Sequence, residues 1–130
     1  MELADLEEQI YFALCQNENL IGMLPKTLSG NMPIFHLFAP ATDSQKYPLI
    51  VYAPLNDTPF LYTDDKETWH KVTIRISIVT NDGQYTEINK IIREIMTDEL
   101  NFKRVNTAPA VDSEQNKIIL NSEYEKIISA

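Results

Sequence analysis

The sequence has only one cysteine, Cys15, so it cannot form an internal disulfide, and this favours a reducing compartment. It has only three glycines and no GxGxxG or GxxxxGK[ST] pattern, which argues against a common phosphate-binding loop. No apolar run reaches the roughly 18 residues of a membrane span, and the acidic start lacks the basic region of a secretory signal. We therefore expect a protein made and kept in the cytoplasm, or in something assembled there, without membrane contact.

Basic residues are also scarce. Eleven lysines and arginines stand against 19 aspartates and glutamates, which gives a formal net charge of -8. The basic residues are scattered, and Lys103-Arg104 is the only adjacent pair. Because an acidic chain repels phosphate groups, direct nucleic-acid recognition and binding to an anionic membrane are both disfavoured.

Patterns that carry catalysis or bind metals are missing as well. The two histidines, His36 and His70, belong to no HExxH or CxxC-type zinc pattern, and each is more simply a histidine of a strand. Cys15 lies at the end of an expected helix, where the helix dipole disfavours a reactive thiolate. The acidic group 64–67 lacks the spacing and glycine of an EF-hand and is typical of a solvated loop. We expect no catalytic residue, no metal and no cofactor, and hence a protein that is not an enzyme.

The hydrophobic pattern predicts one α+β domain spanning residues 1–130. Apolar residues repeat at helical spacing over residues 3–14 and again over residues 84–100. Strict alternation over residues 69–80 predicts a strand with one buried face, formed by Val72, Ile74, Ile76 and Ile78.

Shorter patterns complete the expected fold. Strands are expected at 34–38 and 49–53, and residues 102–105 and 117–120 are expected to form a hairpin around a turn at 112–116. Since only one helix lies between strands, we expect an antiparallel sheet of about four to five strands with two helices packed on one face.

Two features indicate an interaction surface rather than a pocket. The face of the 69–80 strand opposite the core carries an aromatic, hydroxyl and basic mixture, and tryptophan and arginine are enriched at interface anchors. Residues 40–46 and 54–68 are expected to be long loops, which are uncommon in compact domains unless they are functional. The interface residues expected from these features are Trp69, Thr73, Arg75, Ser77, Asp64, Asp65 and Tyr62. A simpler alternative is that Trp69 plugs one end of the domain.

Four stretches resemble the tail-terminator or tail-completion family of long-tailed phages, which is often described as a small tail component or head–tail joining protein. The opening helix with Leu20-Ile21-Gly22-Met23-Leu24, and the strand starting at Tyr47-Pro48, are similar to that family. So are the alternating strand Val72–Val79 and the Asp82-Gly83 turn leading into Ile88 and Ile95. The resemblance covers most of residues 1–100 and does not extend over 101–130.

The resemblance implies an α+β structural subunit that forms a ring, usually a hexamer, on the assembled tail. Such a ring caps the tail tube and docks to the head connector or stopper protein, so the implied partners are copies of the chain, the tail-tube protein and the connector. The implied location is the cytoplasm of a bacterial host during assembly and then the virion tail. An acidic subunit is expected to stay monomeric before docking.

Two other classes of function stay open from the sequence. One is a small-molecule- or peptide-binding module with a pocket between sheet and helices, lined by Tyr52, Tyr62, Trp69 and His70. The other is an enzyme with an unusual site assembled from distant titratable groups, the candidates being Cys15, His36, His70 and Asp64.

Overall fold

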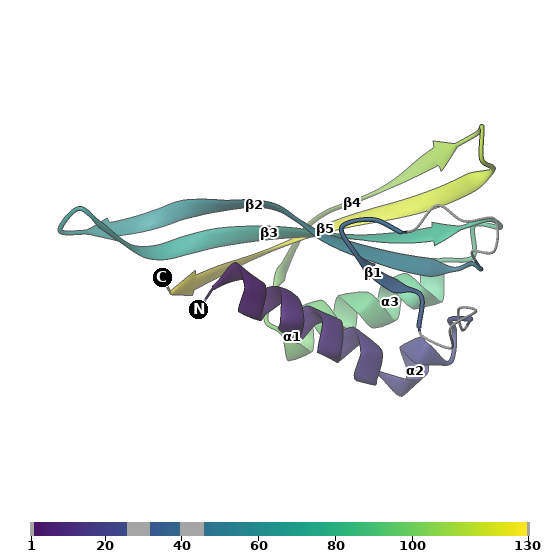
Figure 1. Ribbon diagram of the computed structural model, residues 1–130, viewed down its shortest axis with the longest axis horizontal. Helices are drawn as coiled ribbons and strands as arrows, with labels where there is room; N and C mark the ends of the chain where they lie inside the picture. Colours follow the sequence, from purple (N-terminus) through teal and green to yellow (C-terminus); the bar gives the residue numbers. More distant parts are fainter. Residues whose placement is uncertain (1, 26–31, 40–45, 130) are drawn as a thin grey trace.

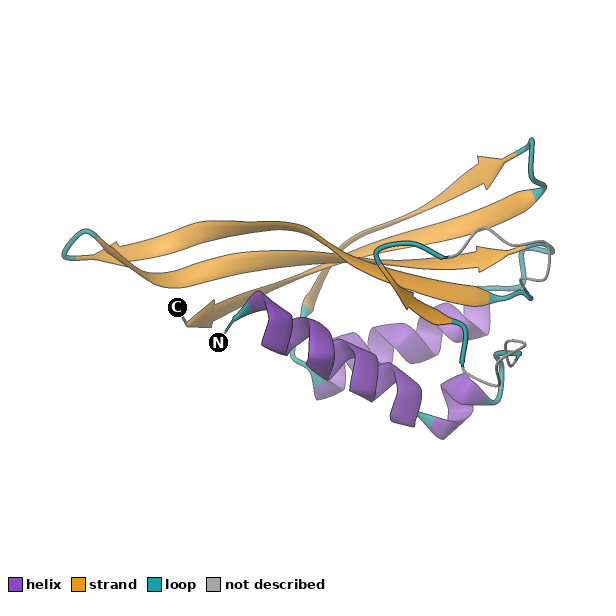
Figure 2. Ribbon diagram, in the orientation of Figure 1, coloured by secondary structure: helices purple, strands orange, loops and turns teal. Residues whose placement is uncertain are grey.

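The computed structural model describes residues 2–25, 32–39 and 46–129. The elements in chain order are α1 (Leu3–Gln16), α2 (Glu18–Ile21), β1 (Ile34–His36), β2 (Leu49–Thr63), β3 (Lys66–Thr80), α3 (Thr86–Glu94), the π-helical turn η1 (Ile95–Glu99), β4 (Lys103–Asp112) and β5 (Lys117–Ser129). Figure 2 shows a long twisted sheet with the helices on one side of it. Most of the expected loop at 40–46 falls outside the described residues.

The α1 helix forms where the sequence predicts it. Leu6, Ile10 and Leu14 are fully buried, which is the outcome expected of apolar residues repeating every four positions on one helical stripe. At its start, the Asp5 carboxylate accepts a hydrogen bond from the Glu2 backbone N–H at 3.2 Å. This bond satisfies one of the donors that a helix N-terminus leaves without a partner.

The α3 helix and η1 together occupy the expected second helix. Ile88, Ile92, Ile95 and Met96 are buried along this element. The last turn widens, since the Leu100 N–H donates to the Ile95 carbonyl at 3.1 Å, an i to i+5 bond. The short α2 helix, capped by the Asn17 side chain on the Leu20 N–H at 3.0 Å, is a third α-helix where two were expected.

The sheet has five strands in the order β1-β2-β3-β5-β4. The expected α+β class is confirmed, but a purely antiparallel sheet is wrong, because β1 pairs with β2 in parallel, with Ile34 opposite Ile50. Residues 37–48 provide the crossover of about a dozen residues that a parallel pair needs. A strand of only three residues gives no sequence signal for parallel pairing.

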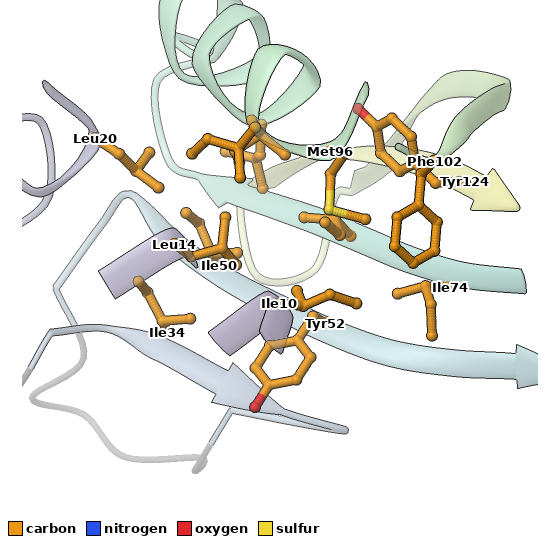
Figure 3. Close-up of a cluster of buried hydrophobic side chains, with 14 of the residues drawn as sticks. Ile10, Leu14, Leu20, Ile34, Ile50, Tyr52, Ile74, Met96, Phe102 and Tyr124 are labelled. Carbon is orange, nitrogen blue, oxygen red and sulfur yellow. The ribbon is translucent and has the colours of Figure 1, made fainter. Parts of the chain in front are cut away.

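The core lies between the helices and the face of the sheet that they cover (Figure 3). The alternation predicted for β3 is confirmed, since Val72, Ile74, Ile76 and Ile78 are all buried on that face. The side chains that Figure 3 shows converging include Ile10, Leu14, Ile50, Tyr52, Ile74, Met96, Phe102 and Tyr124. The opposite face of the sheet carries none of the described helices (Figure 1).

The expected long loop at 54–68 is wrong, because these residues extend β2 and β3 into one continuous hairpin. Its turn is only Asp64-Asp65, with φ of 52° and 63°, the left-handed conformation that tight two-residue hairpin turns require and aspartate tolerates. Pro54 and Pro59 had suggested a break, yet proline is accepted in an edge strand. Register shifts after each of these prolines show how the strand accommodates them.

The expected C-terminal hairpin is confirmed, although its strands are longer than predicted. β4 and β5 pair from Asp112 opposite Lys117 as far as Lys103 opposite Glu125. The last residues continue β5, which lies beside β3 over its length from Thr80 to Trp69. Within the described ranges, no helix has the length and apolar character needed to cross a bilayer.

Candidate interaction surface

The outer part of the β2–β3 hairpin extends past the helices as a two-stranded ribbon (Figure 1). We call residues 55–69 the arm. β1 flanks β2 only at Ile50–Tyr52, and β5 reaches along β3 only to Trp69, so most of the arm has no third strand beside it. Every residue from 55 to 67 is exposed. The arm therefore contributes little to the core and presents both of its faces to the surroundings.

Large apolar side chains gather on this arm. Five of the exposed large hydrophobic residues belong to it: Leu55, Phe60, Leu61, Tyr62 and Trp69. Trp69 is 42 % exposed and lies opposite Leu61 in the ladder, so it does not plug the end of the core. Large apolar and aromatic residues that gather on one projecting ribbon are typical of an interaction surface.

The free strand edges are protected against backbone pairing. Pro54 and Pro59 lie in the part of β2 that β1 does not flank, where β2 is an edge strand. Pro109 lies in β4, at the other edge of the sheet. Each proline removes one N–H donor, and prolines in edge strands hinder the addition of another strand. Contacts made by the arm should therefore depend on side chains more than on an extended sheet.

The residues expected to form one interface separate into two groups. Tyr62, Asp64, Asp65 and Trp69 belong to the arm. Thr73, Arg75 and Ser77 lie on the open face of the sheet, on the part of β3 that β5 flanks along its whole length.

The open-face group is engaged within the chain. An Arg75 guanidinium nitrogen lies 3.3 Å from a Glu123 carboxylate oxygen, and the Ser77 hydroxyl donates to the Asn121 side-chain oxygen at 2.6 Å. The Lys71 ammonium lies 3.9 Å from a Glu125 carboxylate oxygen on the same face. These contacts engage Arg75 and Ser77 within the sheet, whereas the large apolar side chains of the arm are exposed.

The sequence interpretation missed Leu55, Phe60 and Leu61. The available signal was the Asp64-Asp65 pair between two runs rich in β-branched and aromatic residues, because aspartate tolerates the left-handed conformation of a tight turn. The two prolines and the register shifts that follow them obscured it, because they break the regular alternation of the strand.

The four titratable groups considered for a hidden reactive site have separate surroundings. His36 contacts Glu7 at the β1 edge, His70 bonds Asp57 in β2, and Asp64 lies in the hairpin turn. Burial raises the pKa of the Cys15 thiol, and its contact with Tyr11 only partly offsets this. A raised pKa leaves less of the nucleophilic thiolate at neutral pH.

Over the described ranges, neither of the two open depressions is lined by Tyr52, Tyr62, Trp69 or His70, the residues expected to line a pocket. Tyr52 packs in the core against Tyr11 and His36, while Tyr62 and Trp69 belong to the arm. Open depressions of about 330 Å³ and about 400 Å³ lie elsewhere. The first is lined by Met23, Pro48, Asp82, Gln84, Thr86, Glu87 and Ile88, and the second by Ala13, Gln16, Asn17, Glu18, Asn19 and Glu99.

No family model matches the chain, and the curated proteins contain no significant match.

Proposed function

We propose that this chain is a structural subunit that assembles through its arm, as a ring-forming tail terminator or head–tail joining protein of a phage or prophage tail. The observation that carries the assembly role is the projecting ribbon with five exposed large apolar side chains. The phage assignment depends on the resemblance of the opening helix, the β2 and β3 segments and the α3 segment to the tail-terminator family. The proposed partners are further copies of the chain, the tail-tube protein and the head connector.

A closed ring requires two different surfaces on each subunit, because each copy meets one neighbour on each side. The arm is the first of these surfaces in this proposal. A neighbour that covers its apolar side chains removes them from water, at about 25 cal/mol for each Å² of apolar area buried. Charged residues at the arm's turn, Asp64 and Asp65, would then serve orientation and choice of partner more than affinity.

The test is electron microscopy of the purified chain mixed with purified tail tubes from a phage whose genome encodes it. Rings at one end of each tube, with tubes of limited length, are the expected result. Phe60→Ser should abolish the rings, since Phe60 is exposed on the arm, whereas Phe12→Ser should preserve them, since Phe12 is similarly exposed on α1. Absence of rings under every condition, or equal loss in both variants, would count against the proposal. Capsid and tail genes beside this gene would support it independently.

A further inference from the structure

Three potential metal ligands meet where the arm leaves the body of the domain. Asp57 belongs to β2, and Glu67 and His70 belong to β3. Their ligand atoms all lie within 4.8 Å of one another. The ladder places Pro59 opposite His70 and Asp57 opposite Val72, so Asp57 and His70 are diagonal neighbours on one face of the hairpin.

The cluster combines a buried histidine with two exposed carboxylates. His70 is buried, and its Nδ1 atom lies 2.5 Å from an Asp57 carboxylate oxygen, so a bound ion would replace this direct contact by moving the exposed carboxylate slightly outward. Glu67 is exposed, and its longer side chain can rotate to close the distance. A buried histidine beside carboxylates that solvent reaches is a suitable arrangement for a cation that enters from the surface.

The charges of the cluster also favour a divalent cation. Within the described ranges, neither Asp57 nor Glu67 forms an ion pair with a lysine or arginine. Because metal ligands bind in their deprotonated forms, the two carboxylates and the imidazole would together supply two negative charges, which one divalent ion balances. The basic residues of β3, Lys71 and Arg75, form ion pairs with Glu125 and Glu123 of β5.

We infer that Asp57, Glu67 and His70 bind a zinc ion. Zinc accepts imidazole nitrogen and carboxylate oxygen at about 2.0–2.2 Å, and water can fill a fourth tetrahedral position. The imidazole ligand distinguishes zinc from magnesium and calcium, which prefer oxygen ligands alone. The sequence predicts no metal here because Asp57 is far from His70 along the chain and joins it only through strand pairing.

A bound ion would fasten β2 to β3 at the base of the arm. This position matters because isolated two-stranded ribbons are only marginally stable in water. The zinc site is independent of the proposed phage role, since an arm of any assembly protein gains from a fixed base.

Isothermal titration of the metal-free full chain with zinc chloride tests the inference. One zinc ion per chain is the expected stoichiometry. Glu67→Gln removes one ligand charge from an exposed position, so the chain should stay folded while its zinc affinity falls about tenfold or more. Glu114→Gln, the same substitution in the exposed turn between β4 and β5, is the matched control and should leave the affinity unchanged.

A second readout identifies the ligands. Zinc should shift the imidazole nitrogen resonances of His70 in NMR spectra and leave those of His36 in place. Magnesium and calcium at the same concentration should shift neither. The inference is overturned if zinc does not bind, if Glu67→Gln binds it as tightly as the unmodified chain, or if Cys15→Ser abolishes binding.

Discussion

The helix-covered body and the projecting arm use the same residue types for opposite purposes. In the body, Leu14 of α1 is fully buried in the core, whereas Leu61 in the arm is 49 % exposed. The two regions share β2 and β3, so the hydrophobic residues change role along a single pair of strands. The two strands therefore stay paired in the arm without burying their side chains in the core. The apolar side chains of the arm are available for contacts outside the chain.

Matched leucine substitutions should give the largest contrast between the two regions. Leu14→Ala removes buried methyl groups and leaves a cavity, so the free energy of unfolding should fall by about 2–5 kcal/mol. Leu61→Ala removes an exposed side chain and should change it by about 0.5 kcal/mol or less. Urea denaturation followed by circular dichroism measures both values. Equal losses would show that the arm packs into the fold.

Tyr124 allows a sharper test of the body. Its side chain is fully buried, and among the residues that the structure describes its hydroxyl has no hydrogen-bond partner of good geometry. Because an unsatisfied buried hydroxyl is costly, Tyr124→Phe should stabilise the chain by about 1 kcal/mol or leave it neutral. A loss of more than about 1 kcal/mol in urea denaturation would mean that the hydroxyl has a partner.

The same residue predicts a pH dependence. Burial raises the pKa of Tyr124 above its ordinary value of 10.0, and the nearby Ser122 hydroxyl only partly offsets this. The unfolded chain therefore loses this proton first, so the stability is fully present below pH 10.0 and is lost as the pH rises through the higher folded-state pKa. Thermal unfolding from pH 9 to about 11 should show a shallower decline for Tyr124→Phe than for the unmodified chain. Identical slopes would contradict the assigned cause.

The turn of the arm should respond separately from the body. Asp65 has a φ of 63°, which glycine adopts more readily than aspartate. Asp65→Gly should therefore slow amide exchange within the arm by about two- to fivefold, which corresponds to a gain of about 0.5–1 kcal/mol, and leave α1 and α3 unchanged. Faster amide exchange in the arm, or a change in the exchange of the helices, would contradict the claim that the arm's stability is independent of the body.

The open face should show the smallest effect. Arg75→Ala removes a partly exposed ion pair with Glu123, and such pairs contribute about 0.2–1 kcal/mol. The loss in the free energy of unfolding should shrink further in high salt, because ions in solution screen exposed charges. A loss well above 1 kcal/mol, independent of salt, would indicate that the open face belongs to the core.

The sequence predicted the parts of the fold that carry a regular hydrophobic period. α1, the α3 region and the buried face of β3 could be read from Leu6, Ile88 and Ile74 because a repeat of 3.6 or 2 residues is a local property. The parallel pairing of β1 could not be read in this way. It depends on the edge of the sheet to which a three-residue strand adds, and tertiary packing decides this rather than a local sequence pattern.

The candidate surface was predicted only partly for the same reason. Trp69 was identified by residue type and Tyr62 by its place in the segment 54–68, which was interpreted as a loop because of Pro59. Strand pairing across that proline brings the exposed residues onto one arm and places Asp57 beside His70. Such contacts between distant residues leave no local pattern in a single sequence.

Hydrogen–deuterium exchange of the free chain, and of the chain mixed with tail tubes, tests the division of roles most directly. The amides of residues 55–69 should exchange rapidly in the free chain while α1, α3 and β5 stay protected, and they should become protected in the mixture. An arm that is as protected as the body in the free chain, or one whose exchange does not change on mixing, would contradict the claim that its apolar residues serve contacts with other subunits.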